Sequence, residues 1–192
     1  RKFLCGIYHE NRRTASLDRF YETLTKDQVA GIEAVSMDMW DPYLKSTKKH
    51  IPNAESKIVL DRFHIMKMVS HALDLVRRKE QKELSADEGR ILKGSRYALL
   101  FSEENLPKRY KPTLAAIKNS NLKVARAWAM KESIRCLWDY VSEGWARKFF
   151  KQWYWWATHS RLAPMIKLAK TLNAYLDYIV SHAKHQINNA IA

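Results

Sequence analysis

Val35-Ser-Met-Asp38-Met-Trp40 and, about twenty residues later, Ile58-Val-Leu-Asp61-Arg-Phe-His64 carry the main information on the fold of this chain. Each is a short apolar run, partly β-branched, that ends at an aspartate. This pattern is typical of a buried parallel strand that carries a carboxylate to the carboxyl edge of a sheet, where α/β proteins place their chemistry. The second run also has a histidine three residues after its aspartate.

The segments around these runs predict alternating strands and helices. We expect strands over 3–8, 32–37 and 57–60, a helix capped by Ser16 with apolar positions up to Leu24, and another helix from Pro42. The order strand, helix, strand, helix, strand predicts a parallel α/β arrangement with right-handed crossovers. Residues 1–64 therefore form a small α/β portion.

After His64 the pattern becomes helical. One apolar stripe covers residues 65–76, a long amphipathic stretch covers 128–153 with a possible bend at Gly144, and a last helix extends from Pro164 to Ile179. Breaks between 85 and 120 predict short helices and loops. The predicted fold class is α/β with a large all-α part, mostly helical overall.

Composition limits the class of protein. A chain of 192 residues with 46% hydrophobic residues and seven Trp can bury one core, which excludes a disordered chain. No apolar run approaches the roughly 20 residues that span a bilayer. Cys5 and Cys136 lie far apart, which indicates a reducing cytoplasm and neither a disulfide framework nor a zinc site. Because the chain starts at Arg1 within an apparent strand, we expect a piece of a longer protein.

Positive charge is concentrated in the second part of the chain. The net charge is +14, yet residues 1–61 hold 10 Lys and Arg against 9 Asp and Glu, whereas residues 62–192 hold 24 against 11. This segregation favours a surface that faces a polyanion such as nucleic acid. The alternative is a solvated basic surface that serves solubility.

Asp38 is the first candidate for chemistry. A carboxylate at a strand end can bind Mg²⁺, and two such ions about 4 Å apart would activate the attacking oxygen and stabilise the leaving one in phosphodiester chemistry. Alternatively, Asp38 caps the helix that starts near Pro42. Asp41 is the better cap candidate, which would leave Asp38 free.

Asp61 and His64 are open to two interpretations. They form either a pair for metal binding or proton transfer, or a structural clasp in which His64 bonds the Asp61 carboxylate. The spacing Asp-x-x-His alone does not decide between them.

Two groups of residues are candidates for DNA contact. The first is the basic end of the helix that follows His64, which holds Arg77, Arg78, Lys79 and Lys82. The second is Trp155 and Trp156, which could stack on unpaired bases because a Tyr-Trp-Trp run cannot face inward as a whole. Trp138, Trp145 and Trp153 lie on the apolar stripe and are expected in the core. His182 and His185 form a basic helix end rather than a metal site.

At this point the chain resembles a known family, the DDE-type transposases of bacterial insertion sequences, ISL-three group. The likeness is strongest over 30–78 and 160–192 and loose over 85–130. The residues that carry it are Val35-Ser-Met-Asp38-Met-Trp40, Ile51-Pro-Asn-Ala54, Ile58-Val-Leu-Asp61-Arg-Phe-His64-Ile, Ala72-Leu-Asp-Leu-Val-Arg-Arg78 and Ser181-His-Ala-Lys-His-Gln-Ile-Asn-Asn-Ala190.

The resemblance implies a ribonuclease H-like fold interrupted by a helical insertion. It divides the chain into a partial core (1–64), a basic insertion (65–180) and the start of the return to the core (181–192). It also implies cleavage and strand transfer at transposon ends by three carboxylates with Mg²⁺ or Mn²⁺. Asp38 would be the second carboxylate and the metal ligand, and Asp61 with His64 the auxiliary Asp-x-x-His element.

The departures from the family pattern also carry expectations. The family's first Asp would precede Arg1 and its Glu would follow Ala192, because neither Glu143 nor Asp177 has the expected context. We therefore expect this chain alone to be inactive and to bind no metal tightly. The expected partner of the parent protein is DNA, both at transposon ends and at the target. We expect the parent to act as a homodimer or larger assembly. Its expected location is the bacterial cytoplasm, associated with the nucleoid and not with a membrane.

Two other functions fit the same residues. One is a non-enzymatic DNA-binding protein derived from a transposase, which keeps the basic helices. The other is a helical protein-interaction module, for which DNA binding would be absent or insensitive to salt.

Overall fold

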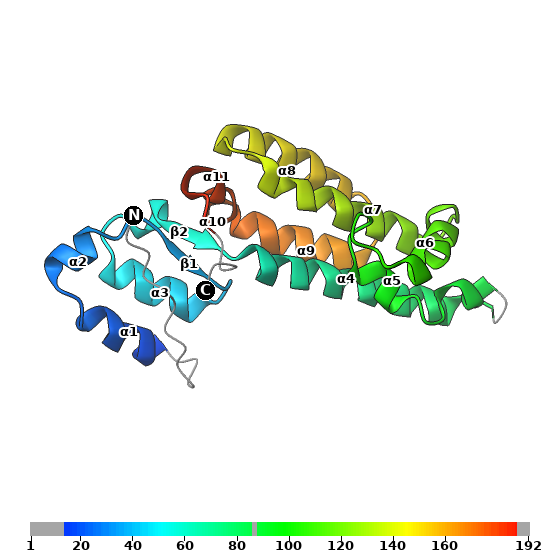
Figure 1. Cartoon of the computed structure of the whole chain (residues 1–192), viewed down its shortest axis with the longest axis horizontal. Helices are drawn as coiled ribbons and strands as arrows, with labels where there is room; N and C mark the ends of the chain where they lie inside the picture. Colours follow the sequence, from blue (N-terminus) through cyan, green and yellow to red (C-terminus); the bar gives the residue numbers. More distant parts are fainter. Residues whose placement is uncertain (1–13, 86–87, 188–192) are drawn as a thin grey trace.

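The computed structural model describes residues 14–85 and 88–187. These residues form a small α/β part and a longer helical part that lie end to end (Figure 1). The strand predicted over 3–8, and Cys5 within it, lie outside the described residues. No helix of the described ranges is long and apolar enough to cross a membrane.

The α/β part contains a parallel pair of strands. Its elements are α1 (Thr14–Glu22), α2 (Lys26–Ala30), β1 (Val35–Met37), α3 (Asp41–His50), the short 3₁₀ helix η1 (Ala54–Ser56) and β2 (Ile58–Leu60). Val35 pairs with Ile58 and Met37 with Leu60 in parallel register, which confirms the parallel arrangement. Both strands are shorter than predicted. The helix predicted from Ser16 already includes that residue within α1, so Ser16 is not its cap.

Burial explains why the two runs form strands. All three residues of β2 are buried, which is typical of a continuous apolar run in a strand covered on both faces. The helix α1 packs on α3, where the hydroxyls of Tyr21 and Thr47 share a hydrogen bond of 2.9 Å. Asp18 joins the same helices by accepting a 2.6 Å hydrogen bond from Ser46. Buried and partly buried hydrogen bonds between α1 and α3 therefore stabilise the part that holds the β1–β2 pair.

The helical part begins with the longest helix, α4 (Arg62–Glu83). The elements after it are η2 (Glu88–Leu92), α5 (Arg96–Leu100), η3 (Lys108–Tyr110), α6 (Lys111–Lys118), α7 (Lys123–Arg135), η4 (Cys136–Asp139), α8 (Glu143–Thr158), α9 (Ala163–Ala174), α10 (Leu176–Val180) and α11 (His182–His185). The short elements between α4 and α7 agree with the predicted breaks.

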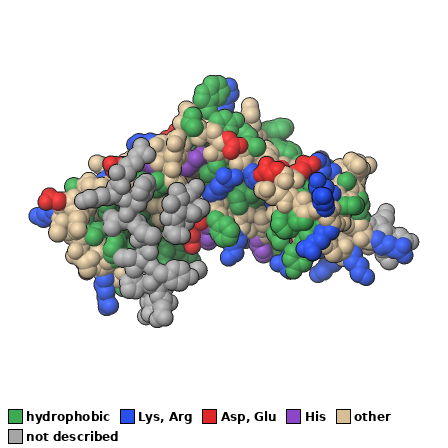
Figure 2. Space-filling model, viewed as in Figure 1, with side chains coloured by type: hydrophobic (Ala, Val, Ile, Leu, Met, Phe, Trp, Pro, Cys, Tyr) green, Lys and Arg blue, Asp and Glu red, His purple; other side chains and the backbone are tan. Residues whose placement is uncertain are grey.

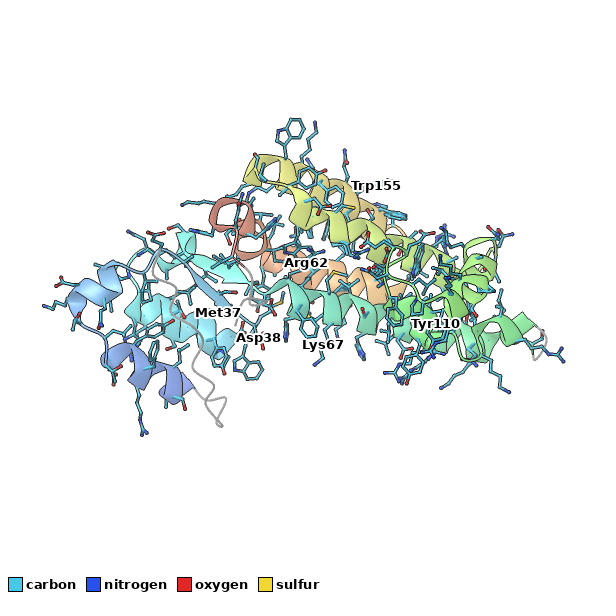
Figure 3. The ribbon with its side chains drawn as sticks, viewed as in Figure 1. Met37, Asp38, Arg62, Lys67, Tyr110 and Trp155 are labelled. Carbon is cyan, nitrogen blue, oxygen red and sulfur yellow. The ribbon has the colours of Figure 1, made fainter. Side chains whose placement is uncertain are left out.

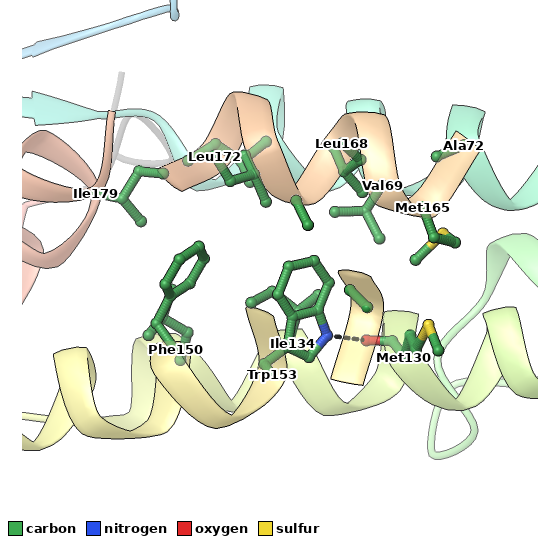
Figure 4. Packing of buried hydrophobic residues seen from close by; sticks show 14 of the residues in the cluster. Val69, Ala72, Met130, Ile134, Phe150, Trp153, Met165, Leu168, Leu172 and Ile179 are labelled. Atoms are coloured by element: carbon green, nitrogen blue, oxygen red, sulfur yellow. Dashed lines mark hydrogen bonds between the residues drawn. The ribbon is translucent and has the colours of Figure 1, made fainter. Parts of the chain in front are cut away.

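The core of this part lies between α4, α7, α8 and α9 (Figure 4). Trp153 of α8 is buried, and its indole N–H donates a 2.9 Å hydrogen bond to the carbonyl of Met130 in α7. A polar atom buried in this way needs such a partner. The other buried side chains that Figure 4 labels are Val69, Ala72, Ile134, Phe150, Met165, Leu168, Leu172 and Ile179.

The structure corrects the long helix predicted over 128–153. The chain leaves α7 at Arg135, passes through η4, and restarts as α8 at Glu143, so that α7 and α8 pack against each other. The buried positions of α8 are Ala146, Phe150, Trp153 and Ala157. At its start this face lies one residue beyond the predicted stripe, at Ala146 instead of Trp145, whereas Trp153 belongs to both. Trp145, expected in the core, is consequently 60% exposed.

The last predicted helix is also divided. The helix α9 ends at Ala174, and α10 and α11 then turn to pack against β2. Ser181 donates a 2.7 Å hydrogen bond to the carbonyl of Ile58 in β2. The chain thus leaves the α/β part along α4 and comes back to it at α10 and α11.

Candidate functional site

Asp38 directly follows β1, as the sequence predicts. Its side chain is 40% exposed, at the carboxyl end of the strand and next to the start of α4 (Figure 3). Helix α3 begins three residues later with Pro42 in its first turn, as expected. A carboxylate in this place can accept hydrogen bonds or bind a hard cation, because part of it remains open to water.

Asp38 does not cap α3, and neither does Asp41. The cap position is Trp40, whose side chain makes no capping hydrogen bond. Asp41 lies in the first turn and instead accepts a 2.6 Å hydrogen bond from the hydroxyl of Tyr175, at the end of α9. The expectation of Asp41 as a cap is therefore wrong. The same hydrogen bond raises the pKa of the Tyr175 hydroxyl, because the neighbouring carboxylate favours the protonated phenol.

His64 faces Asp38. Its Nδ1 atom lies 3.6 Å from Oδ2 of Asp38, and 32% of its side chain is exposed. This separation is too long for a hydrogen bond but suits an ion pair when the imidazole is protonated. Residues from two different elements, the end of β1 and the first turn of α4, therefore meet at this point.

Asp61 has a different role from Asp38. It is buried, and its two carboxylate oxygens accept 3.2 Å hydrogen bonds from the backbone N–H groups of Phe63 and His64. Asp61 is thus the N-cap of α4. In the clasp considered above, His64 bonds the Asp61 carboxylate; here its backbone N–H does so, while its ring points to Asp38. The cap fixes the first turn and, with it, the position of the imidazole.

The residues next to Asp38 and His64 in the sequence include aromatic and cationic side chains. Trp40 is 48% exposed and Phe63 is 77% exposed. The guanidinium of Arg62 lies 5.4 Å from the ring centroid of Trp138, a cation–π contact that ties the start of α4 to η4. Within residues 14–85 and 88–187, no group of three or more His, Cys, Asp or Glu side chains could hold a metal ion.

The predicted basic end of α4 divides into buried and exposed cations. Arg77 is buried, and its guanidinium donates hydrogen bonds of 2.8 and 2.9 Å to Asp74 and Gln81. Arg78 is also paired with Asp74, at 2.7 Å, yet 58% of its side chain is exposed. Arg77 is therefore a structural residue in this chain, whereas Arg78 can reach a ligand in solution.

The other two cations of this group are exposed. Lys79 lies 3.9 Å from Glu83, a distance at which an exposed pair contributes little. Lys82 is exposed one turn further along.

The tryptophans also divide by exposure. Trp153 is buried as predicted, and Trp138 is half-buried. Trp155 is 64% exposed and Trp156 is 36% exposed, which fits their proposed outward position. Trp145 is exposed, although its spacing in the sequence predicts a core position. Ser142-Glu143 is a typical helix start and would have indicated a new helix here, but the hydrophobic spacing continues across it.

The two histidines near the end of the described region make structural hydrogen bonds. His182 is buried, and its Nδ1 lies 2.8 Å from the carbonyl oxygen of Ile179. Nε2 of His185 lies 2.8 Å from the carbonyl oxygen of Ser56, next to β2. Both contacts help to hold α11 in place.

Comparison with known proteins identifies relatives of this chain. A family model described as a transposase, of the DDE type and the ISL3 group, matches residues 7–192. The chain is similar to the transposase for insertion sequence element IS1001 of Bordetella parapertussis, with 31% identity over 175 residues, which cover 90% of this chain and 43% of that transposase. It is also similar to the transposase for IS1557 of Mycobacterium tuberculosis, with 26% identity over 198 residues, which cover 90% and 44%. The chain spans less than half the length of these relatives, and no solved structure matches it.

Proposed function

The chain belongs to the ISL3-group family of DDE-type transposases, and we propose that it is part of an enzyme that cleaves transposon ends and joins them to target DNA. The observation that carries this proposal is the place of Asp38. It follows a parallel strand directly, remains 40% exposed, and faces an imidazole from the next helix. Asp38 is the carboxylate that we assign to the catalytic metal site.

The chemistry of Asp38 suits Mg²⁺ or Mn²⁺. Both ions prefer oxygen ligands, and a half-exposed carboxylate leaves room for the water molecules that Mg²⁺ retains. Such an ion, when bound, stabilises charge on the oxygens of a phosphodiester that is attacked. Asp38 would supply one ligand of a site that other carboxylates of the full-length protein complete.

Asp61 and His64 have positioning roles in this proposal. Asp61 caps α4 and so holds His64 against Asp38. The imidazole of His64, with Nδ1 3.6 Å from Oδ2 of Asp38, would lie beside the carboxylate that binds the cation. The auxiliary Asp-x-x-His element would therefore position an imidazole beside the metal ligand.

The topology supports a ribonuclease H-like core interrupted by an insertion. The β1–β2 pair with α3 between its strands would belong to that core, over residues 1–64. Residues 65–180 would form the helical insertion. The return over 181–192 is supported by the hydrogen bond from Ser181 to Ile58.

DNA is the proposed partner, and the homodimer or larger assembly belongs to the same proposal. Figure 2 shows Lys and Arg side chains along the lower edge of the helical part, where Figure 1 places α4. The exposed cations of α4, which are Arg78, Lys79 and Lys82, would contact DNA phosphates. Arg77 would support them by holding Asp74.

The decisive experiment uses the full-length transposase with labelled transposon-end DNA. We expect Asp38→Asn to abolish strand cleavage in Mg²⁺ and to leave DNA affinity within about twofold, because the amide keeps the shape but loses the charge that a cation needs. Asp27→Asn, at an exposed acid in α2, is the matched control and should cleave normally.

A second variant tests direct ligation. Asp38→Cys replaces an oxygen ligand by a softer sulfur, so we expect more residual cleavage in Mn²⁺ than in Mg²⁺. Normal cleavage by Asp38→Asn would overturn the assignment and favour a DNA-binding protein without this chemistry.

A further inference from the structure

Helix α8 has two unlike faces. Its inner face packs into the core through Ala146, Phe150, Trp153 and Ala157. At 100° per residue these four positions fall within a narrow arc, and the opposite side of the helix is left for solvent. The residues on that opposite side, which are exposed, are Trp145, Lys148, Lys151, Gln152, Trp155, Trp156 and His159.

This outer face of α8 combines large aromatic surfaces with positive charge. Trp145 is 60% exposed and Trp155 is 64% exposed. Figure 3 labels Trp155 at the upper edge of the molecule, and Figure 2 shows hydrophobic and basic side chains together at that edge. Exposed aromatic surface costs free energy in water, and its concentration on one face makes this face a candidate binding site.

The contacts within the face hold its rings in place. The Nζ atom of Lys148 lies 4.8 Å from the ring centroid of Trp145. The rings of Trp155 and His159 stack with centroids 4.6 Å apart and 23° between their planes. Each indole thus has a cationic or titratable neighbour on one side and remains largely open to solvent.

The charges of α8 favour a polyanion over a neutral or apolar partner. The helix has a single acidic residue, Glu143, which lies 3.9 Å from Arg147. Arg147 is itself bound to Asp177 at 2.6 Å, on the side of α10. The exposed ammonium groups of Lys148 and Lys151 would lose hydration without compensation against an apolar protein surface, whereas phosphates would neutralise them.

We propose that the outer face of α8 binds an unpaired DNA strand, with bases stacked on Trp145 and Trp155 and phosphates near Lys148 and Lys151. Bases within a duplex are already stacked on one another, so an indole can stack on a base only where the strand is unpaired. Trp145 and Trp155 are ten residues apart, or about 15 Å along the helix, which leaves room for a strand between them.

This site is separate from Asp38. Figure 3 places Trp155 at the upper edge and Asp38 on the lower side of the molecule. The inference rests on the proposed function in that the partner is DNA, but it needs no cleavage by this chain. The face would hold a strand that has been separated from its complement, away from the carboxylate.

The test measures binding of the 192-residue chain to a fluorescein-labelled, mixed-sequence 20-nucleotide single strand and to the duplex of the same sequence. We expect the double variant Trp145→Ala/Trp155→Ala to bind the single strand at least about tenfold more weakly, because each base stacked on an indole contributes to the binding free energy. Duplex binding should change less than twofold. Tyr97→Ala removes an exposed aromatic ring from α5, outside the face, and should change neither affinity.

A second variant separates stacking from charge. Lys148→Gln/Lys151→Gln should weaken single-strand binding and reduce the dependence of log affinity on log salt by about 1.4, which is about 0.7 for each lost phosphate contact. Both double variants change exposed residues, so their thermal unfolding should match that of the parent chain.

Three results would overturn the proposal. The first is an unchanged single-strand affinity of the tryptophan variant, and the second is an equal loss of affinity for single strand and duplex in that variant. The third is a loss of self-association of the tryptophan variant in sedimentation, which would identify a second copy of the chain as the occupant. Failure of the proposed function is distinguished by Asp38→Asn, which affects cleavage by the full-length protein and leaves single-strand affinity unchanged.

Discussion

Replacement of Glu80 by alanine tests how the helical part is held together. Glu80 lies on α4, is buried, and caps the start of a different helix, α7. Its two carboxylate oxygens accept hydrogen bonds of 2.6 and 2.7 Å from the backbone N–H groups of Lys123 and Val124. The residue at the cap position of α7, Leu122, has no side-chain acceptor of its own. Glu80 therefore satisfies two N–H groups that would otherwise lack partners.

The expected loss follows from these two bonds. A hydrogen bond to a charged group contributes about 1.5–3 kcal/mol, and the loss of an N-cap costs about 0.5–2 kcal/mol. Because the two bonds share one carboxylate, we expect Glu80→Ala to lower the free energy of unfolding by about 3 kcal/mol. Glu80→Gln keeps one carbonyl oxygen and should lose about half of that. For a chain of this size, 3 kcal/mol corresponds to about 6–12 °C in Tm.

Urea unfolding followed by far-ultraviolet circular dichroism measures both variants. The midpoint should fall and the m-value should stay the same. Glu83→Ala is the matched control, because Glu83 lies one turn away and binds the side chain of the same Lys123, at 2.6 Å, but is exposed. We expect little change there. If Glu80→Ala were as stable as Glu83→Ala, the cap between α4 and α7 would not contribute to stability.

Two further predictions concern charged groups elsewhere. Hydrogen bonds from Ser46 and His50 hold the pKa of Asp18 below its ordinary value, although burial opposes this effect. The stability that Asp18 provides is therefore present above about pH 4, and it is lost as the pH falls through the lower pKa of the folded state. Asp18→Asn should weaken this acid dependence below about pH 4, and an identical pH profile there would contradict it. Arg77→Gln should lower the urea midpoint, since it leaves Asp74 with one partner fewer, whereas Arg78→Gln should mainly reduce the salt slope of DNA binding by about 1. The reverse pattern would show that the buried and exposed arginines are assigned wrongly.

The parallel strand pair was predictable because local and global signals agree there. Two short, partly β-branched runs of three buried or half-buried residues, with Pro42 opening a helix between them, leave few other arrangements. The place of Asp38 at the carboxyl end of β1 was predictable for the same reason. The return of α10 and α11 to β2 depends on contacts between residues more than 120 positions apart, such as Ser181 with Ile58, which periodicity cannot show.

The errors at α7 and α8 have a common physical cause. The hydrophobic spacing continues in phase from Ile134 through Trp138 to Trp145, so a window over the sequence detects no interruption. The chain nevertheless turns at 140–142, and α8 restarts with its buried face one residue further on. Trp145 is exposed for that reason. The orientation of a helix is set by its partners, here Met130 against Trp153, rather than by its own periodicity.

The two strand-end aspartates illustrate how one sequence pattern can have two structural outcomes. Asp61 immediately precedes a 22-residue helix, so the free N–H groups of that helix occupy both its carboxylate oxygens. Asp38 is separated from α3 by Met39 and Trp40, and its carboxylate is left for other ligands. The cap at Asp61 also determines where His64 points, because it fixes the first turn of α4. A carboxylate that already accepts two backbone hydrogen bonds is a weak competitor for a metal ion, so the metal ligand that we propose is Asp38 alone of this pair.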